Sequence, residues 1–336
     1  MKTKALIFSA FAAALMISSC ARPAIVGVND ANVKYFNAWL KKYYPDAKKT
    51  DPGIYILEDE PGSGSTIGSV EDYPFIYISY TCYDLLGNIT ETTDSTLCKQ
   101  LGTFKQSSYY GPSVRSREQS SMTAGLEAML SGMRIGGSRK AIIPGWLATS
   151  YRFDTEQGYI NNTTGNDGIY EVKVVDVIAD LPKWQIDSIE RYMVRNLEKK
   201  DSLKYGFYYI QTKAPTDTAK IKSTESVSVN YTGRLLNGSV FDTTDKNLAK
   251  DSGIYNASST YEARTVTMAE EYSDISMTID SSSSSLIDGF SYCLSKMKKG
   301  EKGIALFIST LGYSSTAKDA IPAYSPLRFD IEILDD

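Results

Sequence analysis

The chain has 336 residues, of which 42% are hydrophobic and 23% charged, with a formal net charge of −4 at pH 7. This composition is that of a folded protein with room for two domains, and its acidic balance argues against a nucleic-acid partner. The sequence contains no histidine, which excludes Ser-His-Asp and Cys-His nucleophile systems and histidine-based zinc sites. We expect no metal and no cofactor, so any chemistry must use carboxylates, hydroxyls, aromatic side chains or backbone donors.

The N-terminus carries two lysines, an apolar run over residues 5–16, and then Ile17-Ser18-Ser19-Cys20. The run is too short to span a bilayer as a helix and is typical of a secretory signal. Its last four residues resemble a bacterial lipobox, which implies that residues 1–19 are a lipoprotein signal peptide and that Cys20 is lipidated. An ordinary signal peptide with an incidental Cys20 is the alternative.

Acyl chains on Cys20 would tether the protein to a membrane without spanning it, because each buried methylene contributes about 0.8 kcal/mol. Ala21 and Arg22 carry no acidic signal of the kind that retains enterobacterial lipoproteins at the inner membrane. By that analogy we expect a cell-envelope lipoprotein in the outer membrane, facing the periplasm.

Three further cysteines lie in what would be an oxidising compartment. Cys82 and Cys98 are spaced to close a loop of about fifteen residues, which would stabilise the fold by about 3 kcal/mol if they were bonded. The sequence leaves that pairing open. Cys293 lies on an expected helix, where a cysteine is more often a buried small hydrophobe than a reactive thiol.

The first half begins with a helix predicted over residues 33–44, capped by Asn32 and ended at Pro45, because large apolar residues recur there at three- and four-residue steps. Strands are predicted over residues 54–57 and 75–81. The second half repeats this order with a helix over residues 186–199 and a strand over 206–210.

The stretch from residue 229 to 242 organises the second half. Apolar residues alternate with polar ones up to Tyr231, which predicts a half-buried strand, and Asn237-Gly238 predicts a tight turn that returns the chain through Phe241-Asp242. A polar, Ser/Thr-rich insertion then covers residues 243–285, and we expect a solvated loop, a flap over a cleft or a disordered segment.

The rest of the chain supplies a helix predicted over residues 291–297, opened by Leu286-Ile287-Asp288-Gly289-Phe290 and closed by Lys298-Lys299-Gly300. Strands are predicted over residues 303–308 and 327–334, with Leu311-Gly312-Tyr313 and Ile321-Pro322 between them.

The two halves align as a repeat. Tyr80-Thr81-Cys82 falls on Tyr231-Thr232-Gly233, and the pairs that align later in the chain are Gly125 with Gly289, Met133 with Met297, Gly136 with Gly300, and Ile143-Pro144 with Phe307-Ile308. Without a gap in the hairpin, Thr90 replaces Phe241 and Glu91 replaces Asp242, while Thr149 stands in place of Tyr313. We therefore expect the first copy to fold without catalysing, unless the alignment slips by a residue or two near Thr90.

Seven motifs in one order carry a family resemblance: Tyr-Thr-Gly, Asn-Gly-x-x-Phe-Asp, a helix-opening pair of hydrophobes, Met-x-x-Gly-Glu-Lys, Leu-Gly-Tyr, Ile-Pro and Leu-x-Phe-Asp-Ile-Glu-Ile. Over about a hundred residues the chain resembles an FKBP-type peptidyl-prolyl cis-trans isomerase. The resemblance implies an α+β fold with two FKBP-like domains, each an antiparallel half-barrel sheet wrapped on a short helix and preceded by an extra helix. The expected boundaries are a degenerate domain at 20–180, a helical linker with a leading strand at 181–224, and an isomerase domain at 225–336.

The resemblance also implies which residues act. The expected catalytic residues are Tyr231, Phe241, Asp242, Ile287, Phe290, Tyr313 and Phe329, and the expected substrate-binding residues are Leu286, Ile321 and Tyr324. In these roles aromatic and aliphatic side chains wall in a proline ring, the Tyr313 hydroxyl and the Ile287 amide donate hydrogen bonds, and Asp242 accepts one. The same aromatics at strand spacing could instead form an ordinary core.

Some residues depart from the family pattern. Phe290 replaces a Trp, Ile308 stands where Pro is common, Tyr324 stands where His is common, and the loop from Tyr313 to Ile321 is one residue short. These departures bear on the grip on substrate more than on the fold.

Two functions are compatible with the sequence. The first is a lipid-anchored periplasmic isomerase that acts on proline-containing polypeptides and assists the folding of envelope proteins. The second is an inactive FKBP-like binding or scaffold lipoprotein of an envelope complex.

Overall fold

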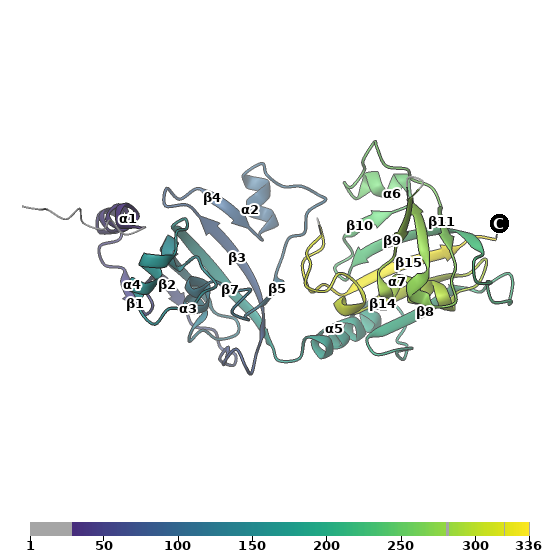
Figure 1. Ribbon diagram of the computed structural model, residues 1–336, viewed down its shortest axis with the longest axis horizontal. Coiled ribbons are helices and arrows are strands. Elements are labelled where there is room, and N and C mark those ends of the chain that lie inside the picture. The colour runs from purple at the N-terminus through teal and green to yellow at the C-terminus, as the bar shows by residue number, and fades with distance from the viewer. Residues whose placement is uncertain (1–28, 280–281, 319, 336) are drawn as a thin grey trace, which may run out of the picture.

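The computed structural model describes residues 29–279, 282–318 and 320–335, and the expected signal peptide and Cys20 lie outside these ranges. Two lobes follow one another along the chain, each built on an antiparallel sheet (Figure 1). Within the described ranges, no helix has both the length and the apolar character needed to cross a membrane.

The first lobe contains a sheet with the strand order β1-β2-β6-β7-β3-β4, with β5 also paired to β3. Its strands are β1 (Lys48–Thr50), β2 (Ile54–Glu60), β3 (Phe75–Tyr83), β4 (Ile89–Thr92), β5 (Ser113–Ser116), β6 (Ser138–Ile143) and β7 (Gly168–Ile178). Its helices are α1 (Asp30–Tyr43), α2 (Ser95–Gln100), α3 (Ala124–Leu130), η1 (Gly145–Leu147) and α4 (Glu156–Asn162).

The connecting helix α5 (Leu181–Asn196) leads into the second lobe, whose sheet has the order β13-β12-β11-β9-β15-β14-β8, with β10 also paired to β9. Its strands are β8 (Phe207–Lys213), β9 (Ser226–Leu235), β10 (Val240–Thr243), β11 (Arg264–Thr267), β12 (Ser276–Ile279), β13 (Ser282–Ser285), β14 (Lys302–Phe307) and β15 (Leu327–Ile333). Its helices are α6 (Lys246–Asp251), η2 (Tyr272–Asp274), α7 (Asp288–Lys296) and η3 (Ser309–Leu311).

The two sheets have the same topology once β1, β12 and β13 are set aside. The order β2-β6-β7-β3, with β4 and β5 on β3, matches β8-β14-β15-β9, with β10 and β11 on β9. Each sheet has its own hydrophobic core, one around Phe36, Met129 and Leu147 and the other around Phe207, Leu294 and Phe307. The predicted fold class, two α+β domains of one kind, is confirmed.

A helix packs very closely on the sheet in both lobes. A Cβ atom added to Gly289 of α7 would lie 2.5 Å from the ring of Phe307, and one added to Gly125 of α3 would lie 2.3 Å from Ile143 Cγ2. The glycine lets the helix backbone approach the strand, which explains why both copies begin this helix with one.

Several predicted boundaries are wrong by a few residues. Helix α1 begins at Asp30 after Asn29, so Asn32 lies within the helix and not at its cap. Helix α5 begins five residues earlier than predicted, because the Asp180 carboxylate accepts the N–H of Lys183 and Pro182 fits the first helical turn.

The expectation of an unstructured insertion over residues 243–285 is also wrong. Its chain forms α6, β11, η2, β12 and β13, and β11 extends the sheet by pairing with β9 from Arg264 to Thr267. Even the serine run forms a strand, because β13 pairs with β12 along its whole length. Hydrogen bonds between strand backbones order this segment, and a pattern of polar side chains gives no sign of them.

Candidate functional site

The hairpin β9–β10 contains a β-bulge that sets the position of Phe241. Val240 pairs with Arg234 and Asp242 pairs with Gly233, so Phe241 is the extra residue between two ladder pairs. Bulges of this kind re-aim a side chain and are common beside active sites. The ring of Phe241 thereby points toward Phe329 of β15, the strand on the other side of β9, and the two ring centroids are 5.5 Å apart.

The rings of Tyr231, Phe241 and Phe290 converge on that of Phe329, and we call these four side chains the aromatic cup. The centroid of Phe329 lies 5.0 Å from that of Phe290, and Tyr231 lies 5.4 Å from Phe290 at an interplanar angle of 76°. These edge-to-face contacts are the favoured geometry for aromatic pairs. Phe290 and Phe329 are buried, whereas Tyr231 and Phe241 are half-buried and partly accessible to solvent.

The start of helix α7 forms one side of the cup. Ile287 occupies the cap position with extended backbone angles, and its side chain and that of Leu286 pack on the same core as the four rings. A helix N-terminus presents backbone N–H groups without intrahelical partners. The structure thus places the expected amide donor next to the expected hydrophobic wall.

The polar edge of the site consists of Tyr231, Asp242 and Tyr313. The hydroxyl of Tyr231 donates to Asp242 Oδ2 at 2.8 Å, and the carboxylate is solvent-exposed. Burial raises the pKa of Tyr313, and the negative charge of Asp242 raises it further. The pKa of Tyr231 is raised by the same two causes in the same order. Both phenols therefore keep their protons and can donate hydrogen bonds at neutral pH.

Ile321 and Tyr324 lie in different surroundings although both follow Tyr313 in the chain. Ile321 is buried and belongs to the same core as the cup. Tyr324 instead packs on Phe75 of the first lobe, with ring centroids 5.2 Å apart, and does not join the cup rings. Of the ten expected site residues, nine contribute to one region of the second lobe, and Tyr324 faces the junction between the lobes.

The Gly-Glu-Lys motif has a structural role. Glu301 is buried, and its carboxylate accepts hydrogen bonds from the Tyr209 hydroxyl at 2.7 Å, the Gln211 amide at 2.8 Å and the Lys298 N–H at 2.9 Å. A buried carboxylate with three donors is satisfied. Glu301 thus ties the end of α7 to strand β8, away from the cup.

The first lobe repeats the hairpin but not the cup. Cys82 pairs with Glu91 and Tyr83 with Ile89, which leaves Thr90 at the same bulge position as Phe241. This register agrees with the ungapped alignment of the two copies. Thr90 and Glu91 are exposed, so the equivalent of the cup lacks the ring of Phe241, although Tyr80 donates its hydroxyl to Glu91 as Tyr231 does to Asp242.

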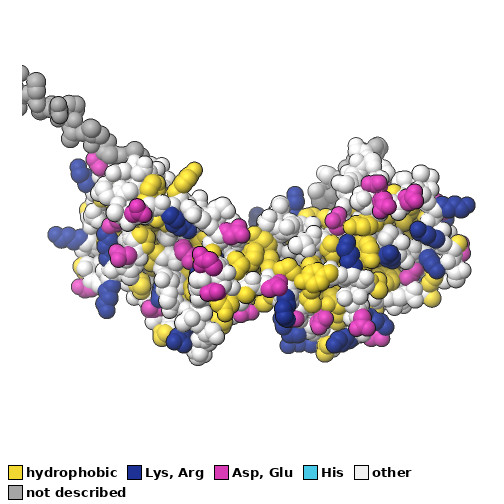
Figure 2. Space-filling model, turned by 60° about the horizontal axis from the view of Figure 1, so that its bottom comes forward, with side chains coloured by type: hydrophobic (Ala, Val, Ile, Leu, Met, Phe, Trp, Pro, Cys, Tyr) yellow, Lys and Arg dark blue, Asp and Glu magenta, His cyan; other side chains and the backbone are white. Residues whose placement is uncertain are grey.

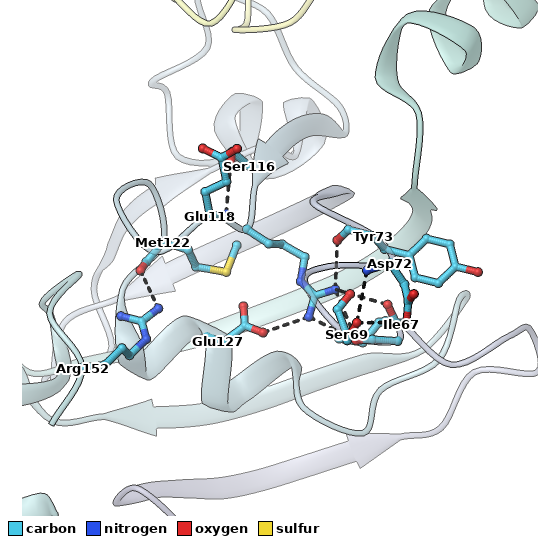
Figure 3. Close-up of polar contacts among 11 residues, drawn as sticks. Ile67, Ser69, Asp72, Tyr73, Ser116, Glu118, Met122, Glu127 and Arg152 are labelled. Atoms are coloured by element: carbon cyan, nitrogen blue, oxygen red, sulfur yellow. Dashed lines mark hydrogen bonds and ion pairs between the residues drawn. The ribbon is translucent and has the colours of Figure 1, made fainter. Parts of the chain in front are cut away.

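In the first lobe, the buried side chain of Arg117 links helix α3 to the loop before β3. The buried guanidinium of Arg117 donates to Glu127 Oε1 at 2.8 Å and to the carbonyl oxygens of Ile67 and Tyr73, both at 3.2 Å (Figure 3). These contacts hold the loop before β3 against the helix and border a cavity of about 530 Å³. Because both terminal nitrogens of the guanidinium already donate to acceptors of the protein, we assign Arg117 a structural role.

Sequence reasoning missed Gly233, which makes room for the cup. Gly233 lies within strand β9 between Thr232 and Arg234, and its Cα faces the rings of Phe241 and Phe329. A glycine inside a strand pattern is a known signal of close approach by another group. In the described ranges, no three Cys, Asp or Glu side chains gather in a way that could hold a metal ion.

Comparison with known proteins finds a family match in the second lobe. Residues 217–334 match the family model for FKBP-type peptidyl-prolyl cis-trans isomerases. A protein of Haemophilus influenzae named as a probable FKBP-type peptidyl-prolyl cis-trans isomerase is 29% identical over 159 residues, which cover 47% of this chain and 54% of the relative. The chain thus spans about half the length of that curated relative.

Two solved structures are also similar to parts of the chain. The three FKBP domains of wheat FKBP73 are 14% identical, with 84% of this chain and 94% of that chain covered and a TM-score of 0.30. A peptidyl-prolyl cis-trans isomerase of Pseudomonas syringae pv. tomato is 19% identical, with 45% of this chain and 92% of that chain covered and a TM-score of 0.31.

Proposed function

We propose that this chain, whose residues 217–334 match the family model of FKBP-type peptidyl-prolyl cis-trans isomerases, is a member of that family and catalyses cis-trans isomerisation of X-Pro bonds in polypeptides. The reaction rotates an amide over a barrier of about 20 kcal/mol, and without a catalyst it takes tens of seconds or longer. It needs no proton transfer and no covalent intermediate, which suits a chain without histidine.

The single observation that carries the proposal is the convergence of three rings on Phe329, beside Tyr313, whose hydroxyl stays protonated. A proline ring is apolar and compact, and aromatic side chains provide a large rigid surface for it. An ordinary core would enclose all four rings, but Tyr231 and Phe241 are half-buried and the neighbouring Asp242 is exposed. Two of the four rings and the carboxylate beside them are therefore in reach of a ligand from solvent.

Catalysis follows from the difference between the planar and twisted amides. The planar amide has charge separated between its oxygen and nitrogen, and an apolar surrounding disfavours it relative to the twisted form. A hydrogen bond from Tyr313 or from the Ile287 amide to a substrate carbonyl can hold the chain in the twisted geometry. Asp242 accepts the hydroxyl of Tyr231 and so fixes the orientation of that ring in the cup.

The first lobe lacks this machinery and would act as a scaffold. Thr90 replaces the ring of Phe241, and Cys82 replaces the glycine that leaves room for it. Burial, followed by the charge of Glu91, raises the pKa of the Cys82 thiol to about 12, so the thiol is not a nucleophile at neutral pH.

We further propose that the isomerase acts on unfolded or newly exported envelope proteins while tethered by lipid on Cys20. The N-terminal segment, with its resemblance to a lipobox, supports a location in the outer membrane facing the periplasm. Metabolic labelling with a radioactive fatty acid tests this part. Label should enter the wild-type chain and be absent from Cys20→Ser, whereas equal labelling of the two would refute lipidation at Cys20.

The activity is tested by a protease-coupled isomerisation assay on a proline tetrapeptide with the chain from Ala21 onward. We expect Phe241→Ala to lower kcat/KM about tenfold, which corresponds to about 1.4 kcal/mol of transition-state stabilisation. The matched control is Thr90→Ala at the equivalent bulge of the first lobe, which should leave turnover unchanged. A folded wild-type protein with no rate above background would favour a binding or scaffold role, and equal activity in Phe241→Ala would remove the cup from the mechanism.

A further inference from the structure

One buried amide side chain joins the connecting helix to the second lobe. Gln185 of α5 is 1% exposed. Its Oε1 accepts the N–H of Ser309 at 2.8 Å, while its Nε2 donates to Ser309 Oγ at 3.0 Å and to the carbonyl oxygen of Tyr324 at 2.7 Å. A side chain with this many buried partners is costly to replace, because each partner would lose its hydrogen bond.

Ser309 and Tyr324, the hydrogen-bond partners of Gln185, lie on either side of the segment that contains Tyr313 and Ile321. Tyr324 also donates its N–H to the carbonyl oxygen of Ser314 at 2.8 Å, so the segment is closed at its base. Ser314 and Tyr324 have φ angles of 51° and 61°, a region that costs a non-glycine residue of order 1 kcal/mol or more. Such a backbone keeps its shape only where its surroundings hold it.

The first lobe contributes to the same support. Phe75 of β3 packs edge-on against Tyr324. Trp184, the neighbour of Gln185 in α5, packs against Tyr77 with centroids 5.2 Å apart and donates its indole N–H to Asp176 Oδ2 at 2.9 Å. Figure 1 shows the segment before β15 lying between the lobes, beside the first sheet and above α5. Figure 2 shows hydrophobic side chains gathered at the narrow junction between the two lobes.

The equivalent position in the first lobe uses a local partner instead. Gly145 begins η1 after Pro144, as Ser309 begins η3 after Ile308. The N–H of Gly145 donates at 2.7 Å to the carboxylate of Asp167, which lies on the loop leading into β7 of the same lobe. In the second lobe the same backbone donor depends on Gln185, a residue 124 positions away.

We propose that Gln185 is a positioning residue of the isomerase site, through which α5 and the first lobe set the place of Tyr313 and Ile321. The first lobe is then a support for the second site and not a second site of its own. The catalytic part of this inference rests on the proposed function, while the mechanical part does not.

The first test is a double-mutant cycle in the full mature chain. Gln185→Met keeps the length of the side chain but removes its hydrogen bonds, and we expect kcat to fall about fivefold with KM changed less than about twofold. If Gln185 acts through Tyr313, adding Gln185→Met to Tyr313→Phe should cost less than a further twofold. Fully additive losses, or an unchanged kcat in Gln185→Met, would overturn the proposal.

The matched control is Asp167→Ala, which removes the equivalent bond in the first lobe and should leave turnover unchanged. If Gln185→Met does not fold, Phe75→Leu tests the same support from the first lobe, since it removes the ring contact with Tyr324 and keeps an apolar side chain in the cluster around Ile178 and Leu181. We expect a smaller loss of kcat that is again absent in the Tyr313→Phe background, and an additive loss there would count against the proposal.

A second readout is independent of turnover. Hydrogen-deuterium exchange should be faster in Gln185→Met at the amides of Ser309 and Tyr324, and unchanged at those of β14. If the wild-type protein shows no turnover but this exchange changes, the proposed function fails and the support by Gln185 stands. If the wild-type protein turns over peptide while neither exchange nor kcat responds, the inference about Gln185 fails alone.

Discussion

A Cβ atom on Gly233 would lie 2.4 Å from Cε2 of Phe241, so this glycine and this ring occupy one space. The first lobe has Cys82 and Thr90 at the two equivalent positions. A side chain at the strand position and an aromatic ring at the bulge position cannot both fit. The second lobe has the ring of Phe241 with no side chain at Gly233, and the first lobe has the side chain of Cys82 with no ring at Thr90. The residues at these two positions therefore differ between the lobes as a pair, because a change at one position requires a change at the other.

We predict that Gly233→Cys displaces the ring of Phe241 and lowers kcat/KM at least tenfold, at a stability cost of about 1–3 kcal/mol from overpacking. Adding Phe241→Thr should recover most of the stability and none of the activity. Urea unfolding and the peptide assay measure the two effects. The control is Cys82→Gly in the first lobe, which should not change turnover, and wild-type activity in Gly233→Cys would contradict the steric argument.

Turnover should not depend on pH between about 6 and 9.5. The pKa values of Tyr231 and Tyr313 are both raised, first by burial and then by the charge of Asp242, so both hydroxyls remain donors past the usual tyrosine pKa of about 10. Because the folded pKa exceeds the unfolded one, this contribution to stability is complete below about pH 10 and is lost as the pH rises through the folded value.

NMR exchange spectroscopy on a proline peptide measures this profile without a coupling protease. Tyr313→Phe should lower kcat/KM about fivefold, since it removes one neutral hydrogen bond of about 1 kcal/mol, and should keep the same flat profile. A wild-type profile that falls between pH 7 and 9 would show that another titrating group controls the reaction.

Arg117→Met should unfold the first lobe at a lower urea concentration. Removing one partner of a buried ion pair typically costs about 3–5 kcal/mol, and here Glu127 and several carbonyl groups would lose their donor. Arg152→Met is the control, because Arg152 also donates to carbonyl oxygens but is solvent-exposed. Equal midpoints for the two variants would argue against a structural role for Arg117.

The three cysteines of the described chain should be found as thiols. Cys82, Cys98 and Cys293 are free in the structure, the latter two are buried, and burial raises the pKa of Cys82 to about 12. Native protein should therefore react slowly with a thiol reagent at pH 8, and denatured protein should yield all three thiols without a reductant. Thiols of Cys82 and Cys98 that appear only after reduction would reveal a disulfide.

The sequence predicted the fold well where local chemistry decides it. Asn237-Gly238 is a turn with φ of 91° at the glycine, and the alternation up to Tyr231 is a strand. The order of the seven motifs also located the rings of the cup. The last strand, predicted over residues 327–334, is β15, and its side chains alternate between buried and half-buried along its length.

Features that depend on distant contacts could not be predicted in this way. The serine run of β13 has no hydrophobic pattern, because its order comes from pairing with β12. Gln185 is an ordinary polar residue in a helical pattern, and only the folded chain shows that its partners are Ser309 and Tyr324. Tyr324 was expected beside the substrate, whereas its ring packs on Phe75 because the first lobe lies there.

The place of α5 has a practical consequence for dissecting this protein. The family match begins at residue 217, yet Ile189, Met193 and Phe207, which precede it, are fully buried in the second core. A fragment cut at the family boundary would expose the apolar surface they cover and would be prone to aggregate. Expression of the second lobe alone should therefore begin no later than Asp180, the residue that caps α5.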